Sequence, residues 1–461
     1  MPKIMNERFA IITCVILFYA CFACYGNYPF YFSKNPTSHY AYLSQGFLSG
    51  QLNLSLSPPE ALLNSPDPYN PVKNKTLRLH DASLYKNKYY MYFGPLPALV
   101  FFIPIKLLTG FYPSESLCVF FFLAMAFLIE FNLLIKIKEK YFSHVSELYL
   151  LLVGLMIGFT NNAPYLLSRP RFYEVAISSA LFLMMLAIFF IYESVNNPIN
   201  KKNVFLFSLF LSLTAACRPH FALICFFLIP AMLFYILTYA PKKNKFSLTA
   251  ILCYPPLFVG ILLALYNYFR FDSILEFGQK FQLAGFDPRK ESLFDFSHLC
   301  SNFWSGFFNY FLEPYSIQKK FPYIHLVHDS AISLMKHYLY EPTIGVLLTS
   351  PFILFIITLP YSIKALIRKN NHKSTPLALF LIFLSVIPIV ITCFLCTISG
   401  ATQRYASDFS PYLIMLAIMS VWLLEEQNIS NFILKNVKYI FIFSAILSIF
   451  IGINLGVLYR I

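Results

Sequence analysis

Residues 94–109 read GPLPALVFFIPIKLLT, and the topology of the whole chain depends on whether this apolar stretch crosses a membrane. The stretch is short and contains three prolines and a lysine, Pro95, Pro97, Pro104 and Lys106. Each proline removes a helix hydrogen bond that lipid cannot replace. We therefore expect a proline-broken segment that lies in, or dips into, the outer interface without crossing.

The composition places the rest of the chain in a membrane. Of its 461 residues, 58% are hydrophobic and only 12% are charged, whereas soluble domains carry about 25% charged residues. The apolar residues fall in long blocks, several of which approach the ~20 residues that a helix needs to cross a bilayer. The sequence predicts an all-α polytopic membrane protein, which excludes a soluble enzyme and a nucleic-acid-binding protein.

Eleven apolar stretches are expected to cross the membrane: residues 9–25, 115–135, 148–163, 175–192, 203–217, 221–240, 247–268, 344–363, 376–398, 409–424 and 438–457. If the N-terminus is inside and residues 94–109 do not cross, the lysine-rich loops are cytoplasmic. The short outer loops then keep four arginines, Arg169, Arg171, Arg218 and Arg404. Because lysine and arginine gather in cytoplasmic loops, this topology is favoured over the inverted one.

Two long outer loops follow from this topology, at about residues 26–113 and 269–341. Both are rich in tyrosine and phenylalanine, as expected of helices that lie along a membrane surface. No internal repeat or linker is found, so residues 1–461 are treated as one domain. The first apolar stretch has no convincing cleavage site and is expected to be a retained helix. Frequent Lys, Asn, Ile and Phe are typical of an AT-rich bacterial genome, which points to an inner membrane.

No metal or other cofactor is expected. No loop holds a pair of the ten cysteines, so neither a disulfide framework nor a zinc site is predicted. His325, His328 and Asp329 have side chains that bind metals, but two histidines three residues apart are a weak signal.

The four outer arginines lie at helix ends in apolar surroundings, where a charge is costly and tends to be paired or functional. One interpretation is that each side chain extends to lipid headgroups. The other is that all four bind one anionic ligand. A phosphate suits arginine, which can hold it through two parallel hydrogen bonds.

Asp81 is the best candidate for a catalytic base, with Asp67 as a second. Asp81 precedes an aromatic stretch at the point where the chain returns to the interface, opposite the arginines. A carboxylate there has the features of a general base beside a phosphate leaving group. The alternative for both residues is a turn aspartate that caps the next element. His80 and Tyr92 flank Asp81 and are included as substrate-binding candidates.

Two further acidic residues stand close to these arginines in sequence and are also candidates for the binding site. Glu174 follows Arg171 by three residues, and Asp408 follows Arg404 by four. Both spacings also fit local ion pairs on a helix surface, which is the simpler interpretation.

Taken together, these residues resemble the GT-C superfamily of integral-membrane glycosyltransferases, and more closely bacterial transferases of the protein-mannosyltransferase and aminoarabinose-transferase type. The matching stretches recur along nearly the whole chain. They are His39–Leu43 running into Gly46–Leu52, His80–Tyr85 through Tyr92–Ala98, Arg169–Glu174, Arg218–Pro219, Arg270–Phe271 with Glu276–Gly278, and Arg404–Tyr405 with Asp408–Phe409.

The resemblance implies transfer of a sugar from a polyprenyl-phosphate donor to an envelope glycan, lipid or protein acceptor on the outer face. Asp81 would deprotonate the acceptor, and Arg169, Arg171, Arg218 and Arg404 would hold the departing phosphate. Many family members carry an acidic residue in the stretch that here spans residues 38–45, and this chain has none there. Either Asp81 or Asp67 takes the catalytic role, or the activity is lost.

Three other classes stay open. A transporter or flippase of lipid-linked glycans predicts charges within spans, and Glu130 is the only acid well inside one. A glycan polymerase or ligase predicts one dominant late outer loop, whereas here the first loop is as large as the second. A scaffold without activity is the third.

Overall fold

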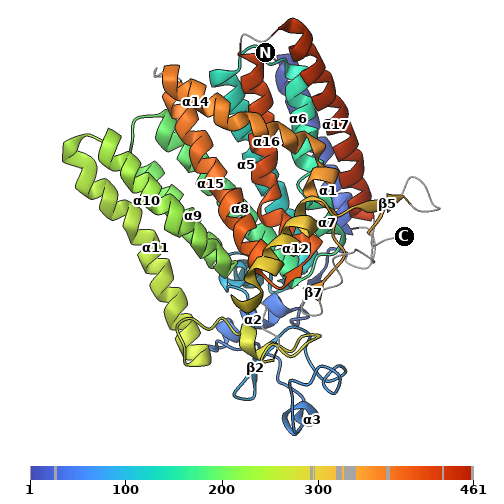
Figure 1. Ribbon diagram of the computed structural model, residues 1–461. Helices are drawn as coiled ribbons and strands as arrows, with labels where there is room; N and C mark the ends of the chain where they lie inside the picture. Colours follow the sequence, from blue (N-terminus) through green and yellow to red (C-terminus); the bar gives the residue numbers. More distant parts are fainter. Residues whose placement is uncertain are drawn as a thin grey trace.

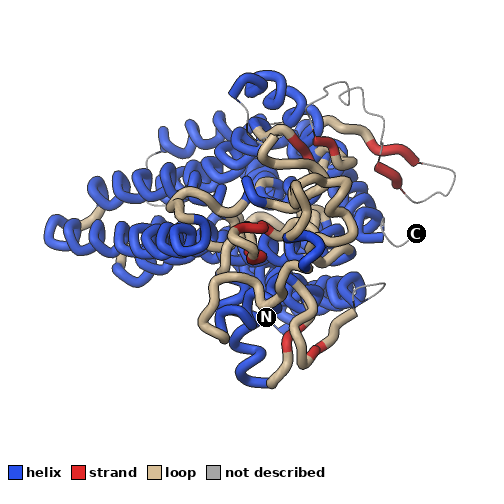
Figure 2. Tube along the Cα trace, turned by 90° about the horizontal axis from the view of Figure 1, so that it is seen from below, coloured by secondary structure: helices blue, strands red, loops and turns tan. Residues whose placement is uncertain are grey.

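The computed structural model of the chain is a bundle of long helices with most of its irregular chain at one end (Figure 1). It describes residues 2–24, 29–290, 294, 296–317, 324–326, 339–369, 374–427 and 430–457. Seen along the bundle, the strands and loops gather over the helix ends (Figure 2). We call this the loop end, and the opposite end, where the N-terminus lies, the lysine-rich end.

The helices of the bundle follow the predicted apolar stretches. They are α1 (Pro2–Cys24), α5 (Glu115–Tyr141), α6 (Glu147–Phe159), α7 (Ala163–Ser168), α8 (Phe172–Asn196), α9 (Lys201–Ala215), η2 (Pro219–Phe221), α10 (Ala222–Tyr239), α11 (Lys242–Phe271), α13 (Val346–Thr349), η6 (Pro351–Thr358), α14 (Leu359–Lys369), α15 (Ser374–Thr397), α16 (Ser410–Glu425) and α17 (Asn431–Val457).

Each of the eleven predicted spans coincides with a helix of the bundle. Among the described residues, eight helices are long and apolar enough to cross a membrane. The other three, α6, α9 and α16, have 13, 15 and 16 residues. At a rise of about 1.5 Å per residue these three are shorter than the ~30 Å hydrocarbon core. A membrane protein of many helices is therefore confirmed, and the count of eleven stays a prediction.

The loop end is built from short elements. They are β1 (Phe32–Ser33), α2 (His39–Leu48), α3 (Glu60–Leu63), β2 (Ser83–Tyr85), β3 (Lys88–Tyr90), η1 (Ala98–Phe102), α4 (Ile103–Thr109), β4 (Tyr112–Pro113), η3 (Gln279–Phe281), η4 (Phe296–His298), α12 (Leu299–Phe311), β5 (Tyr315–Ile317), β6 (Ile324–Leu326), β7 (Leu339–Tyr340), β8 (Gly400–Ala401) and η7 (Gln403–Asp408). The strands pair as β1–β4, β2–β3 and β5–β6, all antiparallel, and as β7–β8 in parallel.

Most of residues 94–109 forms one short helix, Ala98–Thr109. A π-helical turn, η1, continues into α4, which ends at Gly110 with a φ of +79°. The combined helix Ala98–Thr109 is about 18 Å long at 1.5 Å per residue, too short to cross a bilayer. Leu107 and Leu108 on it are exposed, while Lys106 donates to the carbonyl of Gly110 at 2.8 Å. The length agrees with a segment that does not cross, and its place along the interface stays a prediction.

Glycines allow the last helix to approach its neighbours closely. A Cβ on Gly452 of α17 would lie 1.8 Å from the carbonyl oxygen of Phe159 at the end of α6. One helical turn later, a Cβ on Gly456 would lie 2.8 Å from the ring of Phe22 in α1. Small residues four apart let helix backbones touch in a membrane. This contact seats α17 against α1 and α6.

Candidate functional site

Asp81 lies at the loop end with its backbone held in an unusual conformation. Its φ of +59° lies in the left-handed region, which costs energy for a residue with a Cβ. Its N–H donates to the carbonyl of Leu283 at 3.1 Å, and Leu283 in turn donates to the carbonyl of Ala82 at 2.9 Å. The first long loop is thereby bonded to the segment that follows α11. Asp81 itself is 8% exposed.

The carboxylate of Asp81 faces α8. Its Oδ2 accepts a hydrogen bond from the hydroxyl of Tyr173, and Nε2 of His80 lies 3.7 Å from the same oxygen. The ring of His39 stacks on Phe172 with 4.0 Å between centroids, and its Nε2 donates to the carbonyl of His80 at 2.9 Å. Asp81 and His80 are therefore fixed beside the start of α8.

Arg404 lies on the other side of Tyr173. Its guanidinium carbon is 4.1 Å from the centre of the Tyr173 ring, a cation–π contact. One nitrogen, Nη2, lies 3.2 Å from Oε1 of Glu341, whose other oxygen accepts from Thr402 at 2.7 Å. Its Nε is buried and has no hydrogen-bond partner among the described residues.

Arg218 forms a second, deeper centre of positive charge. Its Nη2 lies 2.9 Å from Oδ2 of Asp408, and Nε2 of His220 lies 3.3 Å from the same oxygen. Arg218 is 4% exposed and Asp408 2%. Nε and Nη1 of Arg218 are buried without a hydrogen-bond partner in the described part of the chain. A buried guanidinium with free N–H groups is ready to bind an anion.

Aromatic rings join the two arginines into one site. The guanidinium carbon of Arg218 lies 5.3 Å from the centre of the Tyr405 ring, and that of Arg404 lies 5.9 Å from it. Arg218 also lies 5.9 Å from the ring centre of Phe93, which packs edge-on against Tyr173 at 6.0 Å. Asp81, Arg404 and Arg218 are therefore linked through shared neighbours.

The remaining candidates at this site have partly structural roles. Oε2 of Glu174 accepts from the N–H of Arg171 at 3.0 Å and so caps α8, while the charges of Arg404 and Arg169 act on the same carboxyl. Burial, followed by the charge of Asp81, raises the pKa of Tyr92 well above its ordinary value. Tyr92 therefore keeps its proton at neutral pH.

The pairing of Asp408 differs from the local ion pair that its spacing to Arg404 offers. Asp408 lies against Arg218, and Arg404 lies against Glu341. The reason is that residues 403–408 form a 3₁₀ turn, η7. With about three residues per turn, side chains four apart no longer share a face.

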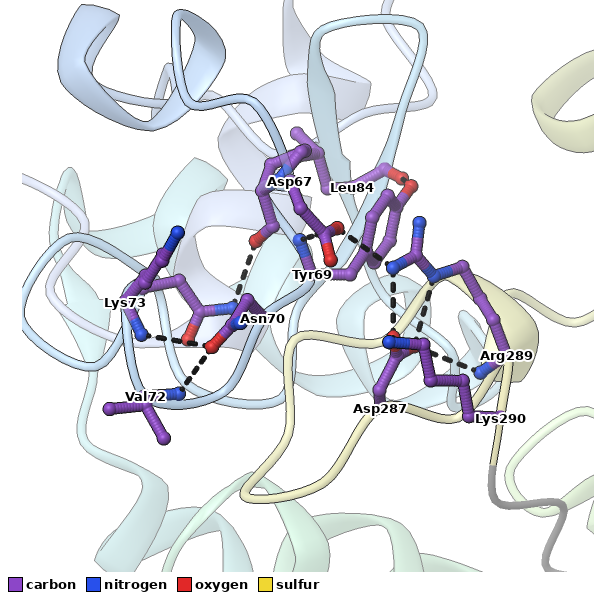
Figure 3. Close-up of polar contacts among 11 residues, drawn as sticks. Asp67, Tyr69, Asn70, Val72, Lys73, Leu84, Asp287, Arg289 and Lys290 are labelled. Atoms are coloured by element: carbon purple, nitrogen blue, oxygen red, sulfur yellow. Dashed lines mark hydrogen bonds and ion pairs between the residues drawn. The ribbon is translucent and has the colours of Figure 1, made fainter.

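Asp67 belongs to a different cluster, which we call the loop clasp (Figure 3). Its Oδ1 accepts from Nη2 of Arg289 at 2.8 Å and from the N–H of Tyr69 at 3.2 Å. Arg289 also binds both oxygens of Asp287 and lies 4.2 Å from the ring centre of Tyr69. The clasp ties the first long loop to the second, and a catalytic role for Asp67 stays a prediction.

The loop clasp is expected to open in acid. Hydrogen bonds from Arg289 hold the pKa of Asp287 below its ordinary value of 3.8. A lowered carboxyl pKa means that the stabilisation is present at neutral pH and is lost as pH falls below about 4. Protection factors of the amides of residues 279–290, which correct for the pH dependence of intrinsic exchange, should fall below that pH, and Arg289→Ala should show low protection at every pH. Equal exchange rates in the variant and the wild type would contradict this role.

Gly94 sets the position of Phe93 beside Arg218. Its N–H donates to the carbonyl of Cys217 at 3.1 Å, and the N–H of Leu96 donates to that of Ala216 at 3.2 Å. A Cβ on Gly94 would lie 1.8 Å from the carbonyl oxygen of Ala216, so that a side chain cannot fit without a backbone shift.

Gly94→Ala is therefore expected to destabilise the protein by about 1–3 kcal/mol, the usual cost of overpacking. Gly260→Ala is the control, because a Cβ there meets nothing within 4 Å and alanine favours the helix by about 0.5–1 kcal/mol. Thermal unfolding of the detergent-solubilised protein measures both. A lower midpoint for Gly260→Ala than for Gly94→Ala would refute the packing argument.

Sequence reasoning missed several members of the site. Tyr173 and Tyr405 lie within matching stretches but were not selected as site residues, His220 lies two residues after Arg218, and Glu341 carries no motif. Two of the three possible metal ligands, His328 and Asp329, lie outside the described residues. The side chain of the third, His325, is not described. In the described ranges, no group of three or more His, Cys, Asp or Glu side chains could hold a metal ion.

No protein-family model matches the chain, and no curated protein sequence does. Solved structures do. The crystal structure of the apo oligosaccharyltransferase of Archaeoglobus fulgidus aligns with a TM-score of 0.50 and 11% identity, over 97% of this chain and 55% of that protein. The same organism's oligosaccharyltransferase in complex with an inhibitory peptide and a dolichol-phosphate aligns with a TM-score of 0.48 and 11% identity, with the same coverage.

The fold resembles that of the apo oligosaccharyltransferase. The predicted helical architecture is confirmed, since the described residues form many helices, eight of them long and apolar enough to cross a membrane. The chain spans about half the length of these neighbours. At 11% identity the likeness concerns the fold alone.

Proposed function

We propose that this protein is a membrane glycosyltransferase that moves a sugar from a polyprenyl-phosphate donor to an envelope glycan, lipid or protein acceptor. One observation carries the proposal: a carboxylate, Asp81, shares a site with two buried arginines that keep N–H groups without a hydrogen-bond partner among the described residues. The site lies at the loop end of a GT-C-like bundle. Within the superfamily, the motifs around Asp81 and Arg169 favour the bacterial mannosyltransferase and aminoarabinose-transferase type.

The proposed reaction is a direct displacement at the sugar. Asp81 accepts the proton of the acceptor hydroxyl, and the acceptor oxygen forms a bond to the anomeric carbon. The bond from that carbon to the phosphate oxygen breaks, and its electron pair leaves with the lipid phosphate. Arg218 and Arg404 stabilise the additional negative charge, and Arg169 and Arg171, just before α8, are proposed to contribute to the same field. Tyr92 and His80 lie at the carboxylate side, where the acceptor would be held.

The lysine-rich end supports an outward-facing site. Lys136, Lys138 and Arg8 pair there with Glu193, Glu147 and Glu139. Positively charged ends face the cytoplasm, so the loop end would face the periplasm or the exterior of a bacterial inner membrane. The donor would then be used on the side to which lipid-linked sugars are delivered for envelope assembly.

A deletion strain complemented with the wild type or with Asp81→Asn tests the proposal. Mass spectrometry compares the envelope glycolipids and the polyprenyl-phosphate sugars of the three strains. Loss of a single sugar from one glycan, restored by the wild type and not by Asp81→Asn, is the expected result. Loss of whole repeat units, or rescue by Asp81→Asn, would instead favour a polymerase or a flippase.

A further inference from the structure

Tyr173 contacts both chemical halves of the site. Its hydroxyl donates to Oδ2 of Asp81, and its ring lies under the guanidinium of Arg404 at 4.1 Å. The side chain comes from the first turn of α8, a helix buried along most of its length. Tyr173 itself is 7% exposed.

The ring of Tyr173 has little freedom to move. It packs against Phe172 with 3.9 Å between centroids and meets the edge of Phe93 at 6.0 Å and 90°. Phe93 is itself held by the backbone contacts of Gly94 with the end of α9. A hydroxyl on such a ring is a donor in a fixed position, which is what an oriented carboxylate needs.

Asp81 is fixed on its backbone side as well. Its N–H is bonded to Leu283, and its φ of +59° restricts the chain on either side. What the backbone does not determine is the rotation of the carboxyl group about χ2, which is a broad torsion in aspartate. The hydrogen bond from Tyr173 to Oδ2 determines that rotation.

We propose that Tyr173 is a positioning residue for the transfer reaction, with its hydroxyl orienting Asp81 and its ring seating Arg404. The inference rests on the proposed function and adds to it a residue that the motifs did not select. With Oδ2 held by Tyr173, Oδ1 takes the proton from the acceptor. Because Arg404 stacks on the same ring, the phosphate that it binds is held at a constant distance from Oδ1. The base and the leaving group are then positioned at the same time.

A pH dependence follows from this arrangement. The groups that face Asp81 are His80 beside it, His39 from α2, Tyr92 from the first loop and Tyr173 from α8. Burial lowers the pKa of His39 to about 4, so this ring stays neutral over the working range. A hydrogen bond to a carboxylate favours its ionised form. Loss of the Tyr173 hydroxyl should therefore move the acid limb of the transfer rate to higher pH.

Tyr173→Phe is the decisive variant, because it removes the hydroxyl and keeps the ring under Arg404. The assay uses the full-length protein in proteoliposomes, with a lipid extract of the deletion strain as the source of unconsumed donor and acceptor. We expect kcat to fall about tenfold, and the acid limb of the kcat profile to move up by about one pH unit, as for one lost hydrogen bond to a charged group. The apparent KM for the extract should change less than twofold.

Two further variants separate positioning from folding. Tyr19→Phe removes a buried hydroxyl that donates to the carbonyl of Gly158 at 2.7 Å, away from Asp81, and should leave the acid limb in place. Tyr173→Leu removes the ring as well. It should raise the apparent KM for the extract, because Arg404 loses the aromatic ring on which its guanidinium stacks. Thermal unfolding of each variant shows whether it is folded at the assay temperature.

The outcomes distinguish the inference from the proposed function. An inactive Asp81→Asn together with a wild-type pH profile for Tyr173→Phe would overturn the positioning role and leave the glycosyltransferase standing. A fully active Asp81→Asn would overturn both. An equal shift of the acid limb in Tyr173→Phe and Tyr19→Phe would also overturn the inference, since the effect would then come from the loss of any buried hydroxyl.

Discussion

Substituting Arg218 by methionine is expected to destabilise the protein by about 3–5 kcal/mol, the cost of leaving one partner of a buried ion pair behind. Asp408 is 2% exposed, and its Oδ2 lies 2.9 Å from Arg218. Methionine fills much of the space but supplies no charge. His220, at 3.3 Å, is the remaining neighbour that can pair with the carboxylate when it is protonated. Equilibrium unfolding in detergent at neutral pH measures the change.

The double variant Arg218→Met/Asp408→Leu separates the fold from the chemistry. Replacing both charges by apolar side chains is often neutral or stabilising, so we expect stability within about 1 kcal/mol of the wild type. Sugar transfer should still be lost, because the deeper of the two anion-binding arginines is gone. Wild-type transfer by the double variant would show that Arg218 serves the fold alone. A single variant as stable as the wild type would contradict the burial of the pair.

Asp81→Asn is expected to lower the rate of sugar transfer by about 10²–10⁴-fold, the usual contribution of a general base. Asparagine keeps the size of the side chain and can still accept from Tyr173, so the fold should be preserved. The rate is measured in the proteoliposome assay at saturating extract, with thermal unfolding alongside.

Asp67→Asn is the matched control, because it makes the same chemical change in the same loop. Asp67 contacts Arg289 and Tyr69 in the loop clasp, and its side chain is 34% exposed. We expect transfer within threefold of the wild type and a modest loss of stability, since an exposed ion pair contributes about 0–1 kcal/mol. A larger loss of transfer in Asp67→Asn than in Asp81→Asn would exchange the roles of the two residues.

Much of the fold could be predicted from local sequence. Apolar blocks become helices because a helix satisfies its backbone hydrogen bonds within four residues, which lipid requires. The prolines of residues 94–109 predict a segment that does not cross, because each removes a helix hydrogen bond that lipid cannot replace. The predicted span of residues 344–363 illustrates the limit: the helix there is η6 continued by α14, Pro351–Lys369, shifted toward the C-terminus. The boundaries of a helix depend on its capping residues and on tertiary packing, and hydropathy reports neither.

The site was only partly predictable. Topology alone predicts that Arg169, Arg171, Arg218 and Arg404 lie on the outer side, because each follows or precedes an expected span there. The contact partners of the site residues could not be predicted from the spacing of residues in the sequence. Tyr173 reaches Asp81 across 92 residues, and Arg289 reaches Asp67 across 222. No helical or strand periodicity extends over such separations.

The sequence by itself determined that this protein is a helical membrane protein, and its charge pattern predicts that the four arginines and Asp81 share one side of it. These properties follow from the free energy of transferring side chains and backbone into lipid. Each residue contributes to it largely independently of residues far away in the sequence. Only the tertiary structure decided that Arg218 pairs with Asp408, that Asp67 serves the loop clasp, and that Tyr173 connects Asp81 to Arg404. Those choices depend on which buried charges and hydroxyls meet when the helices pack, because an unpaired polar group in that interior is costly.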